Sequence, residues 1–369
     1  MIWIAVTAWL CYSLLIGVFY IGWKRLHTPA EKNASLKVGV SVVVAMRNEA
    51  PQVETFLHSV AAQQYEPFEL IVVDDHSEDD TLQHLIRLQQ QHFMNMQVIR
   101  LQEGFGKKAA LAQGIALAKY NLILTTDADC RFGRQWIKTL VDTYEAEDNP
   151  AMVLAPVALE GSNRMFDKWQ SLEFGSLMVS TAGAVGLGVP FMSNGANLMF
   201  RKDAYDEVGG YARHNHQPSG DDVFLLHQLK QKGKKIVFAK DNCAQVWTTT
   251  QKTLKQFLRQ RVRWASKTKS YTDGFSVGVA GLVFVYSLLM LLSMCALPWC
   301  WQAALLLWGG KMLIDFPLLY SYFSFEQRKY LMKHYVGVQV AYPFYICIVA
   351  FCALRGKFEW KGRILFNGR

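Results

Sequence analysis

Long apolar segments at both ends of this 369-residue chain decide which folds it can adopt. Hydrophobic residues make up 51% of the sequence and aromatic residues 13%, and the apolar excess is concentrated at the two ends. Each segment is long enough to cross a bilayer as a helix. The sequence therefore predicts a transmembrane helix within residues 1–26 and a group of transmembrane or interfacial helices within 275–354. The apolar segments themselves are residues 2–22 and roughly 276–297, 299–321 and 335–354.

The basic residues beside these segments predict how the chain is oriented. Lys24 and Arg25 follow the first apolar segment, whereas a cleaved signal peptide carries its positive charge before such a segment. Basic residues stay on the cytoplasmic side and are attracted to anionic lipid, which explains the formal net charge of +9 without a nucleic-acid partner. We predict an integral protein of a bacterial inner membrane whose central domain is cytoplasmic.

Two features complicate this topology. Lys311 and Asp315 both lie in the third apolar segment, so they must pair with each other or face inward. Four complete spans that start outside would also end outside, yet the basic tail 355–369 belongs on the cytoplasmic side. We therefore favour one incomplete span that only dips into the interface.

The middle of the chain predicts an α/β fold. Between residues 38 and 156, apolar runs of strand length alternate with amphipathic stretches of helix length. This alternation is typical of a parallel sheet with helices on both faces, which binds ligands beyond the carboxyl ends of its strands. We take residues 38–272 as one cytoplasmic domain with interfacial helices. The expected strands are 38–46, 70–73, 97–101 and 121–125, and the expected helices are 107–119 and one from residue 135.

Residues 162–190 allow two interpretations. They are Gly-rich and only partly apolar, too broken for a membrane span. They form either an amphipathic element that lies against the bilayer or a plain helix that packs in the core.

Two carboxylates that follow a predicted strand form the strongest local signal. Asp127 and Asp129 are separated by one small residue, so both can bind one hard divalent cation through oxygen. Mg²⁺ or Mn²⁺ at this place suits a reaction whose leaving group is a diphosphate, on which negative charge builds up. The alternative is a solvated turn, because Asp is common in loops. The scattered cysteines include no Cys-x-x-Cys pair, so we expect neither disulfides nor a thiolate metal site.

Polar residues after the first two strands are placed to line the same pocket. Asp74 and Asp75 end the second strand, and Asp75 is the better candidate to contact a base or ribose. The alternative for this pair is to cap the next helix. Arg47 and Glu49 follow the first strand and face the same edge of the sheet.

A pair of lysines at the start of a predicted helix suggests an anion. Lys107 and Lys108 occupy a helix N-terminus, where positive side chains are unfavourable unless an anion is present. The pattern favours phosphate binding, and the alternative is a solvated lysine pair.

A second acidic pair begins a later helical pattern. Asp221 and Asp222 in a first turn can simply complement the helix dipole. The functional alternative makes one of them a general base that removes a proton from an acceptor hydroxyl. His214 and His216 lie in the preceding loop, which we interpret as a flexible cover over the acceptor rather than a metal site.

A basic helical pattern near residue 260 carries an amide, a guanidinium and an indole together. Gln260 precedes Arg263 and Trp264 by one helical turn, so the three share one surface region. Arg263 can direct two donors to a diphosphate, and Trp264 can form a flat wall for a sugar ring. The alternative is a basic interfacial helix with its Trp at the headgroup level.

In this order, the motifs resemble family 2 glycosyltransferases of the membrane-integrated type, which include cellulose and hyaluronan synthases and ceramide glucosyltransferase. The resemblance covers roughly residues 38–270 and the flanking helices. It implies a Rossmann-like GT-A domain and inverting, metal-dependent transfer of a sugar from a nucleotide sugar, UDP-linked, to a lipid or glycan acceptor. The roles that it implies are base contact for Asp75, metal-diphosphate binding for Asp127 and Asp129, general base for Asp222, and the Gln-x-x-Arg-Trp motif for Gln260, Arg263 and Trp264.

The chain also departs from that pattern. Asp221 stands where a Glu usually precedes the base, which keeps the charge but shortens the reach. The predicted spans are fewer than in the large polymer synthases. We therefore expect transfer of one or a few sugars to a membrane lipid. The alternatives are a processive polysaccharide synthase of the same family and a non-catalytic membrane protein that binds nucleotides.

Overall fold

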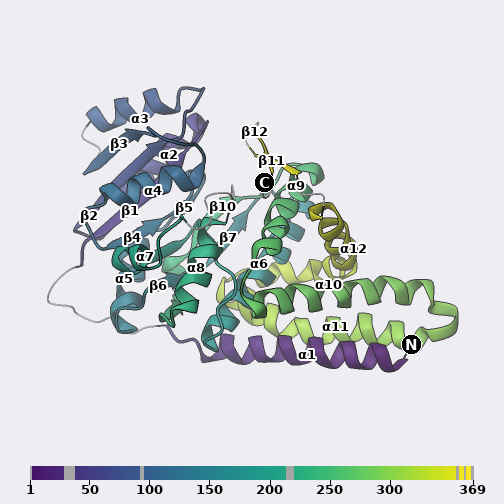
Figure 1. Ribbon diagram of the computed structural model, residues 1–369. Coiled ribbons are helices and arrows are strands. Elements are labelled where there is room, and N and C mark those ends of the chain that lie inside the picture. The colour runs from purple at the N-terminus through teal and green to yellow at the C-terminus, as the bar shows by residue number, and fades with distance from the viewer. Residues whose placement is uncertain are drawn as a thin grey trace. The chain divides into compact units, whose positions relative to one another are not determined.

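The computed structural model describes residues 2–28, 38–91, 95–212 and 220–354, and the backbone of 357–360 and 363–366. The chain divides into two compact units, which are interleaved in sequence (Figure 1). The helical unit comprises Met1–Leu26, Leu159–Phe191 and Thr250–Arg369, and the sheet unit comprises His27–Ala158 and Met192–Thr249. Residues 159–191 and 250–272 therefore group with the terminal helices.

The sheet unit contains the α/β elements predicted from the sequence. The predicted strands and helices between residues 38 and 146 are all present, with boundaries shifted by a few residues. In chain order the elements are β1 (Val40–Met46), α2 (Ala50–Ala61), β2 (Phe68–Asp74), α3 (Thr81–Gln90), β3 (Met96–Arg100), α4 (Lys107–Leu117), β4 (Leu122–Thr125), β5 (Arg131–Phe132), α5 (Trp136–Ala146), β6 (Met152–Leu154), β8 (Leu198–Arg201), α7 (Lys202–Glu207), α8 (Asp221–Gln231), β9 (Ile236–Phe238), η2 (Asn242–Ala244) and β10 (Val246–Thr249). The strand β7 (Val157–Glu160) lies at the boundary of the two units.

The main sheet is parallel in its first half and mixed in its second. Its order is β3-β2-β1-β4-β8-β6-β9. The strands β3, β2, β1 and β4 are parallel, as predicted, whereas β8 is antiparallel to both β4 and β6. The parallel sheet predicted from the alternation in residues 38–156 is therefore present in β1 to β4. The antiparallel strand β8, which comes later in the chain, adds β6 and β9 to it.

Burial of β1 on both sides explains why this strand lies inside the sheet. Its residues Val40, Val42, Val43, Val44 and Met46 are at most 1% exposed. Successive strand residues point to opposite faces, so both faces of β1 are covered. The Val-rich run read from the sequence thus forms the centre of the core.

The helical unit contains the apolar segments. Its elements are α1 (Ile2–Arg25), α6 (Met165–Gly186), α9 (Leu254–Ser266), η3 (Lys267–Ser270), α10 (Gly274–Cys295), α11 (Leu297–Phe325), η4 (Lys329–His334), α12 (Tyr335–Ala353), β11 (Lys357–Trp360) and β12 (Arg363–Phe366). The strands β11 and β12 pair antiparallel within the predicted basic tail 355–369, whose side chains lie outside the described residues. The 213–219 loop with His214 and His216 also lies outside them.

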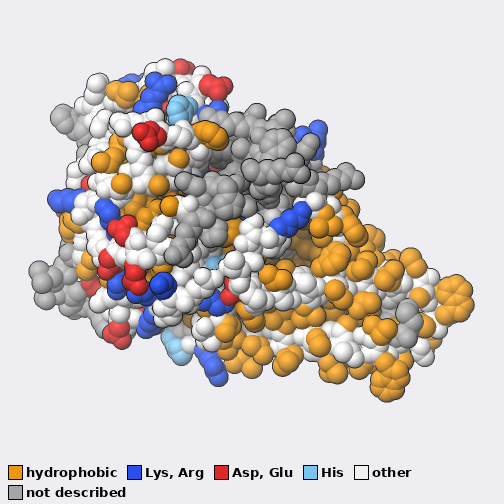
Figure 2. Space-filling model, viewed as in Figure 1, with side chains coloured by type: hydrophobic (Ala, Val, Ile, Leu, Met, Phe, Trp, Pro, Cys, Tyr) orange, Lys and Arg blue, Asp and Glu red, His pale blue; other side chains and the backbone are white. Residues whose placement is uncertain are grey.

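Four segments in the described part of the chain are long and apolar enough to cross a membrane. Figure 2 shows hydrophobic side chains gathered over α1, α10 and α11. The exposed hydrophobic residues of these helices include Leu14, Val285 and Leu313. These segments match the predicted apolar stretches. Which of them cross completely, and which side holds the sheet unit, stay predictions. The four segments are Ile2–Arg25, Gly274–Cys295, Leu297–Phe325 and Lys329–Ala353.

The charged pair in the third apolar segment, Lys311 and Asp315, is buried, and both side chains form hydrogen bonds. The Lys311 Nζ lies 2.5 Å from Asp315 Oδ2 and 2.6 Å from Gln339 Oε1. The Tyr12 hydroxyl donates to Asp315 Oδ1 at 2.9 Å, and Gln339 Nε2 donates to Asp315 Oδ2 at 3.1 Å. The expectation that the two charges pair inside the helical group is confirmed, and the network joins α1, α11 and α12.

The helix α6 is a buried helix that packs against α1 and α11. This burial favours the core-packing interpretation of residues 162–190. Glycines bring α1 and α6 very close together, because a Cβ at Gly22 would overlap the Gly183 oxygen. A Cβ at Gly183 would likewise overlap the Phe19 oxygen, and neither backbone atom can rotate away.

Gly183→Ala is expected to destabilise the helical unit by about 1–3 kcal/mol, because the added methyl group must push α1 away from α6. Gly17→Ala is the matched control, since a Cβ at Gly17 meets nothing within 4 Å. That control should be neutral or slightly stabilising, as Ala favours helix over Gly. Thermal unfolding of both variants in the same detergent measures the difference. Equal midpoints would contradict the close contact.

Candidate functional site

The carboxyl ends of three parallel strands carry predicted site residues to one edge of the sheet. The strand β1 pairs with β2 on one side and β4 on the other, and Met46 is opposite Asp74. Asp75 follows the end of β2 directly, and Asp127 comes two residues after the end of β4. Because parallel strands end at the same edge, these loops are neighbours, as predicted.

One lysine joins two carboxylates from different elements. The Lys107 Nζ lies 2.6 Å from Asp127 Oδ1, after β4, and 3.7 Å from Asp221 Oδ2, at the start of α8. Burial alone lowers the pKa of Lys107, but the charges of Asp127 and Asp221 more than reverse this, so its pKa is raised and the amine stays charged. Residues far apart in sequence thus meet at one charged centre.

Left-handed glycines begin both helices that contribute to this centre. Gly106 precedes α4 with φ +93°, and Gly220 precedes α8 with φ +93°. This region of backbone conformation strongly favours glycine. The turns place Lys107 and Asp221 at the first positions of their helices.

Backbone amides hold the second acidic residue of α8. The Gly195 N–H donates to Asp222 Oδ2 at 3.0 Å, and the Val223 N–H donates to Asp222 Oδ1 at 2.8 Å. A Cβ at Gly195 would lie 3.2 Å from Asp221 Oδ2 and 3.3 Å from Lys107 Nζ. The carboxylate of Asp222 is therefore fixed in orientation beside Lys107 and Asp221. No sequence motif marked Gly195, whose contribution is a backbone amide.

Asp127 and Asp129 fit a divalent cation bound through oxygen. Ligand atoms of Asp127, Asp129 and Cys130 all lie within 4.8 Å of one another. Burial, followed by the charges of Asp127 and Asp129, raises the pKa of the Cys130 thiol well above its usual value. Hard cations such as Mg²⁺ and Mn²⁺ prefer oxygen to sulfur, so the two carboxylates are the suited donors of this group. The Thr248 hydroxyl donates to Asp129 Oδ2 at 3.0 Å and so orients it.

The Arg47 guanidinium stabilises the loop after β2 through three hydrogen bonds. It donates to the Asp75 carbonyl at 2.9 Å, to the His76 carbonyl at 2.9 Å and to Glu78 Oε1 at 2.8 Å. Glu49 is half-buried at the start of α2, where its N–H donates to Thr81 Oγ1 at 2.8 Å. Arg47 thus shapes the loop that holds Asp75.

Asp74 and Asp75 are both 1% exposed. Asp74 Oδ2 accepts from the Ser77 N–H at 3.3 Å, while its Oδ1 is buried without a hydrogen bond to any described residue. The Asp75 Oδ1 lies 3.3 Å from His76 Nδ1. The N-cap of α3 is Asp80, so neither Asp74 nor Asp75 caps that helix.

The two lysines of α4 point to different partners. Lys108 is buried, and its Nζ lies 5.1 Å from the centre of the Phe224 ring in α8. Lys107 contacts the carboxylates instead. The pair therefore connects α4 to α8 in two ways, through charge and through a cation–π contact.

The Gln-x-x-Arg-Trp residues belong to the helical unit. Gln260, Arg263 and Trp264 lie on α9 and are all half-buried. Their neighbour Arg261 was not predicted from the sequence; it is buried and paired with Glu173 of α6. Glu173 is the only charged residue of α6 after Lys168, and this was the available signal for the pair.

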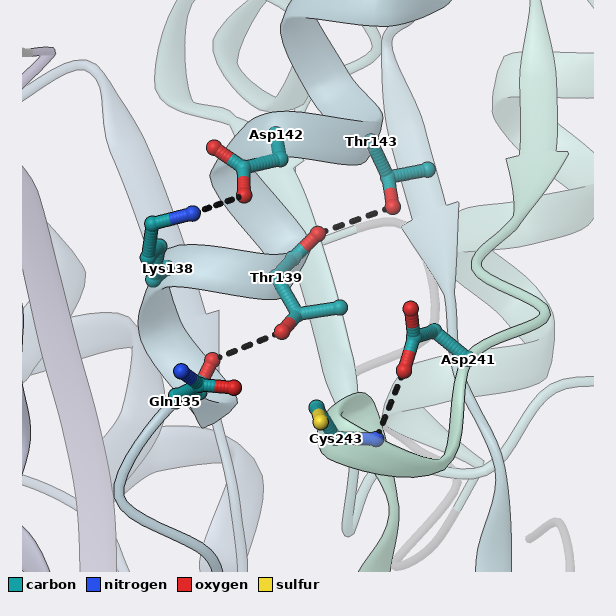
Figure 3. A pocket seen from close by; sticks show the side chains of 7 residues that line it. All are labelled: Gln135, Lys138, Thr139, Asp142, Thr143, Asp241 and Cys243. Carbon is teal, nitrogen blue, oxygen red and sulfur yellow. Dashed lines mark hydrogen bonds and ion pairs between the residues drawn. The ribbon is translucent and has the colours of Figure 1, made fainter. Parts of the chain in front are cut away.

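A separate small pocket lies between α5 and η2 in the sheet unit (Figure 3). Its volume is about 70 Å³. Its polar groups bond within the wall, as in the contact of 2.8 Å between Lys138 Nζ and Asp142 Oδ2. It shares no residue with the acidic centre, which is formed by Asp127, Asp221 and Asp222 around Lys107. The lining residues are Gln135, Lys138, Thr139, Asp142, Thr143, Asp241 and Cys243.

Curated relatives of the chain include two bacterial synthases. Poly-beta-1,6-N-acetyl-D-glucosamine synthase of Staphylococcus aureus (strain COL) is 24% identical over 264 residues, 69% of this chain and 61% of that relative. The synthase of the same name from Staphylococcus epidermidis is 24% identical over 233 residues, 62% of this chain and 54% of that relative. The chain thus spans less than two thirds of the length of these relatives.

A solved structure shares the fold. The mannosyltransferase PcManGT from Pyrobaculum calidifontis, solved in complex with GDP-Man and Mn²⁺, matches with a TM-score of 0.56 at 18% identity. The match covers 94% of this chain and 95% of that chain. The predicted fold class, a Rossmann-like α/β GT-A glycosyltransferase domain, is confirmed.

The family model described as glycosyl transferase family 21 matches residues 6–366, nearly the whole chain. The prediction of a glycosyltransferase is confirmed. The match extends over both units, including the four segments that could cross a membrane. The protein is therefore an enzyme that belongs to glycosyl transferase family 21.

Proposed function

We propose that this enzyme transfers a sugar, with inversion, from a UDP-linked nucleotide sugar to a membrane lipid or lipid-linked acceptor. The observation that carries the proposal is the position of Lys107, which contacts Asp127 and Asp221 together. This contact supports the proposal, because it joins Asp127 of the proposed diphosphate site to Asp221, the neighbour of the proposed base Asp222 on α8. Both groups are needed at one reaction centre.

Donor binding is assigned to the edge of the sheet. Asp127 and Asp129 would hold Mg²⁺ or Mn²⁺, which, when bound, would neutralise charge on the diphosphate. Mn²⁺ and GDP-Man are bound in the mannosyltransferase of similar fold, which agrees with such a donor site. Lys107 is assigned to the phosphates, whereas Lys108, which the sequence also suggested for them, is buried against Phe224. Asp75 is assigned to the base or ribose, and Arg47, Glu49 and Asp74 shape that part of the pocket.

The proposed chemistry is a single displacement. Asp222, held by the amide of Gly195, takes the proton of the acceptor hydroxyl while that oxygen attacks the anomeric carbon. The bond from that carbon to the diphosphate oxygen breaks on the opposite face, and the nucleoside diphosphate leaves with the bonding electrons. The configuration inverts and no covalent enzyme intermediate forms. Asp221 supports the charge of Lys107 beside the base.

The acceptor is assigned to the membrane because of the helical unit. Four apolar segments of membrane-spanning length surround the part of the chain that carries Gln260, Arg263 and Trp264 in sequence. We assign Arg263 to the diphosphate and Trp264 to a sugar ring. The sheet unit is proposed to lie in the cytoplasm of a bacterium, where nucleotide sugars are made, with the helices in the inner membrane.

A processive polysaccharide synthase is the second candidate function. It is favoured by the name of the curated relatives, a poly-beta-1,6-N-acetyl-D-glucosamine synthase, at 24% identity over 69% of this chain. Product length separates the two candidates. A single lipid-linked sugar supports the first, and a ladder of products of increasing length supports the second.

Release of nucleoside diphosphate by detergent-purified protein tests both candidates. A panel of nucleotide sugars is supplied with Mg²⁺ or Mn²⁺, with and without membrane lipid extract, and Asp222→Asn provides the blank. Release that depends on lipid and on one donor supports transfer to a lipid. Lipid-independent release with a growing product supports the synthase. No release with any donor would overturn the proposed function.

Asp129→Ala is expected to lower metal-dependent donor affinity by at least about 10- to 100-fold, the range already seen when only a partner of a metal ligand is removed. Thr248→Val removes such a partner, because it deletes the hydroxyl that orients Asp129, and should lose about 10-fold. Calorimetric titration of nucleotide with Mn²⁺ and with EDTA measures both. The control is Asp206→Ala, an exposed carboxylate in α7. Unchanged Mn²⁺-dependent binding by Asp129→Ala would place the metal elsewhere.

A further inference from the structure

A buried ion pair lies beneath the Gln-x-x-Arg-Trp helix. Arg261 of α9 and Glu173 of α6 are each 4% exposed. The Arg261 Nε lies 3.1 Å from both Glu173 carboxylate oxygens, and a second guanidinium nitrogen also donates to Oε2. The Tyr345 hydroxyl of α12 donates to Glu173 Oε1 at 2.8 Å. Three helices of the helical unit therefore fix one guanidinium in place.

The same guanidinium contacts two residues of the motif. The third Arg261 nitrogen donates to Gln260 Oε1 at 2.6 Å. The Arg261 Cζ lies 4.2 Å from the centre of the Trp264 ring and 4.6 Å from that of Phe257. Arg261 is thus bonded to Glu173 on one side and holds Gln260 and Trp264 on the other.

This contact decides which end of the Gln260 amide is available. An amide side chain has one oxygen that accepts and one NH₂ group that donates. The oxygen of Gln260 is bound by Arg261, and its Nε2 forms no hydrogen bond to any described residue. Since Gln260 is half-buried rather than enclosed, it presents a donor beside the indole of Trp264.

We propose that Arg261, fixed by Glu173 and Tyr345, is a positioning residue that aims the Gln260 amide donor and the Trp264 ring at the sugar of a substrate. A sugar ring offers hydroxyl oxygens that accept from an NH₂ group and a face of C–H groups that packs on an indole. The assignment rests on the proposed function. It adds Arg261, Glu173 and Tyr345 to the residues on which transfer depends.

A purely structural role for the ion pair makes different predictions. A buried pair of charges gives little net stability compared with apolar residues of the same size, because both charges lose their hydration. If the pair only joined α6 to α9, activity would change only when stability changed. Variants that keep the Arg261–Glu173 pair and change the Gln260 amide therefore distinguish a structural role from a positioning role.

Gln260→Glu is the decisive variant. Glutamate keeps an oxygen for the Arg261 donor, so the protein should unfold at the same temperature or higher, but it has no NH₂ group. The kcat/KM for transfer is expected to fall by about 10- to 100-fold, the value of one hydrogen bond to substrate. Gln256→Glu is the matched control, since it makes the same change elsewhere on α9. The side-chain oxygen of Gln256 accepts from the Thr253 N–H in the capping box of this helix, and glutamate keeps that oxygen. This control should retain wild-type kcat/KM.

Arg261→Lys tests whether Arg261 acts through Gln260. Lysine keeps the charge beside Glu173 but cannot hold both Glu173 and Gln260 with a planar fork. We expect a loss of about 10-fold, and no further loss when Arg261→Lys is added to Gln260→Glu, because residues that act as a unit are not additive. If the KM for the nucleotide sugar rises in these variants, the sugar that Gln260 and Trp264 contact is that of the donor. If the KM for the acceptor rises instead, it is a sugar of the acceptor.

Three results overturn the proposal or its basis. Wild-type kcat/KM in Gln260→Glu at unchanged unfolding temperature removes the donor role of Gln260. Additive losses in the double variant show that Arg261 does not act through Gln260. Absence of transfer by the wild-type enzyme with every donor and lipid overturns the proposed function itself, and with it this assignment. Lower activity in Gln260→Glu, unchanged Gln256→Glu and a non-additive double variant together support it.

Discussion

Replacing Asp222 by asparagine is expected to lower kcat by about 10²- to 10⁴-fold, the usual contribution of a general base. Asparagine has nearly the same shape, and its oxygen can still accept from the Gly195 amide that holds Asp222 at 3.0 Å. Its NH₂ group loses the local contact with the Val223 N–H of the next residue. The variant should therefore fold normally and bind the nucleotide sugar, while the acceptor hydroxyl keeps its proton. Steady-state transfer kinetics together with donor titration measure both properties.

Asp206→Asn is the matched control for this variant. It removes one carboxylate charge from an exposed position of α7, outside the acidic centre, so kcat should be unchanged. Normal turnover by a well-folded Asp222→Asn enzyme would contradict the base assignment and direct attention to Asp221. A loss of donor binding instead of kcat would show that Asp222 belongs to the donor site.

Lys311→Met is expected to produce the largest loss of stability, about 3–5 kcal/mol, because it leaves the buried Asp315 carboxylate without its counter-charge. Lys311 is 2% exposed, and its Nζ lies 2.5 Å from Asp315 Oδ2. The variant breaks the network that joins three helices. The free energy of unfolding in mixed micelles of increasing denaturing-detergent content measures the loss.

The double variant Lys311→Met with Asp315→Asn is the control for charge imbalance. It removes both charges but keeps a side-chain oxygen that can accept from Tyr12, which donates to Asp315 at 2.9 Å. Removal of a complete buried pair is often close to neutral, so most of the lost stability should return. A double variant as unstable as Lys311→Met alone would show that the lysine itself, and not the uncompensated carboxylate, decides stability.

The parts of the fold that follow from local patterns could be predicted from the sequence. The run Val40–Met46 is long, apolar and Val-rich, and it forms the buried strand expected of it. The second half of the sheet is different. The strands Met152–Leu154 and Ile236–Phe238 have three residues each, too short for a recognisable periodicity. Their order is set by pairing between distant segments, which no local pattern encodes.

The candidate site likewise contains residues that could be predicted from the sequence and residues that could not. Carboxylates at strand ends, such as Asp127, are recognisable because the carboxyl edge of a parallel sheet is known to bind ligands. Gly195 was missed because it acts through its backbone N–H, which every non-proline residue possesses. Arg261 was missed because its neighbours Gln260 and Arg263 already matched a motif. Only packing against α6 shows which of the two arginines is buried.

The late position of β8 in the chain has a consequence for biosynthesis. This strand fills the place next to β4, although Leu198 is made 73 residues after Thr125, with which it bonds. At about 5–20 residues per second, a nascent chain waits about 4–15 s for its missing neighbour. Until then β4 is an open edge of the kind that pairs with other chains and aggregates. The speed of the ribosome over codons 126–197 therefore sets how long this edge of each new molecule stays unpaired.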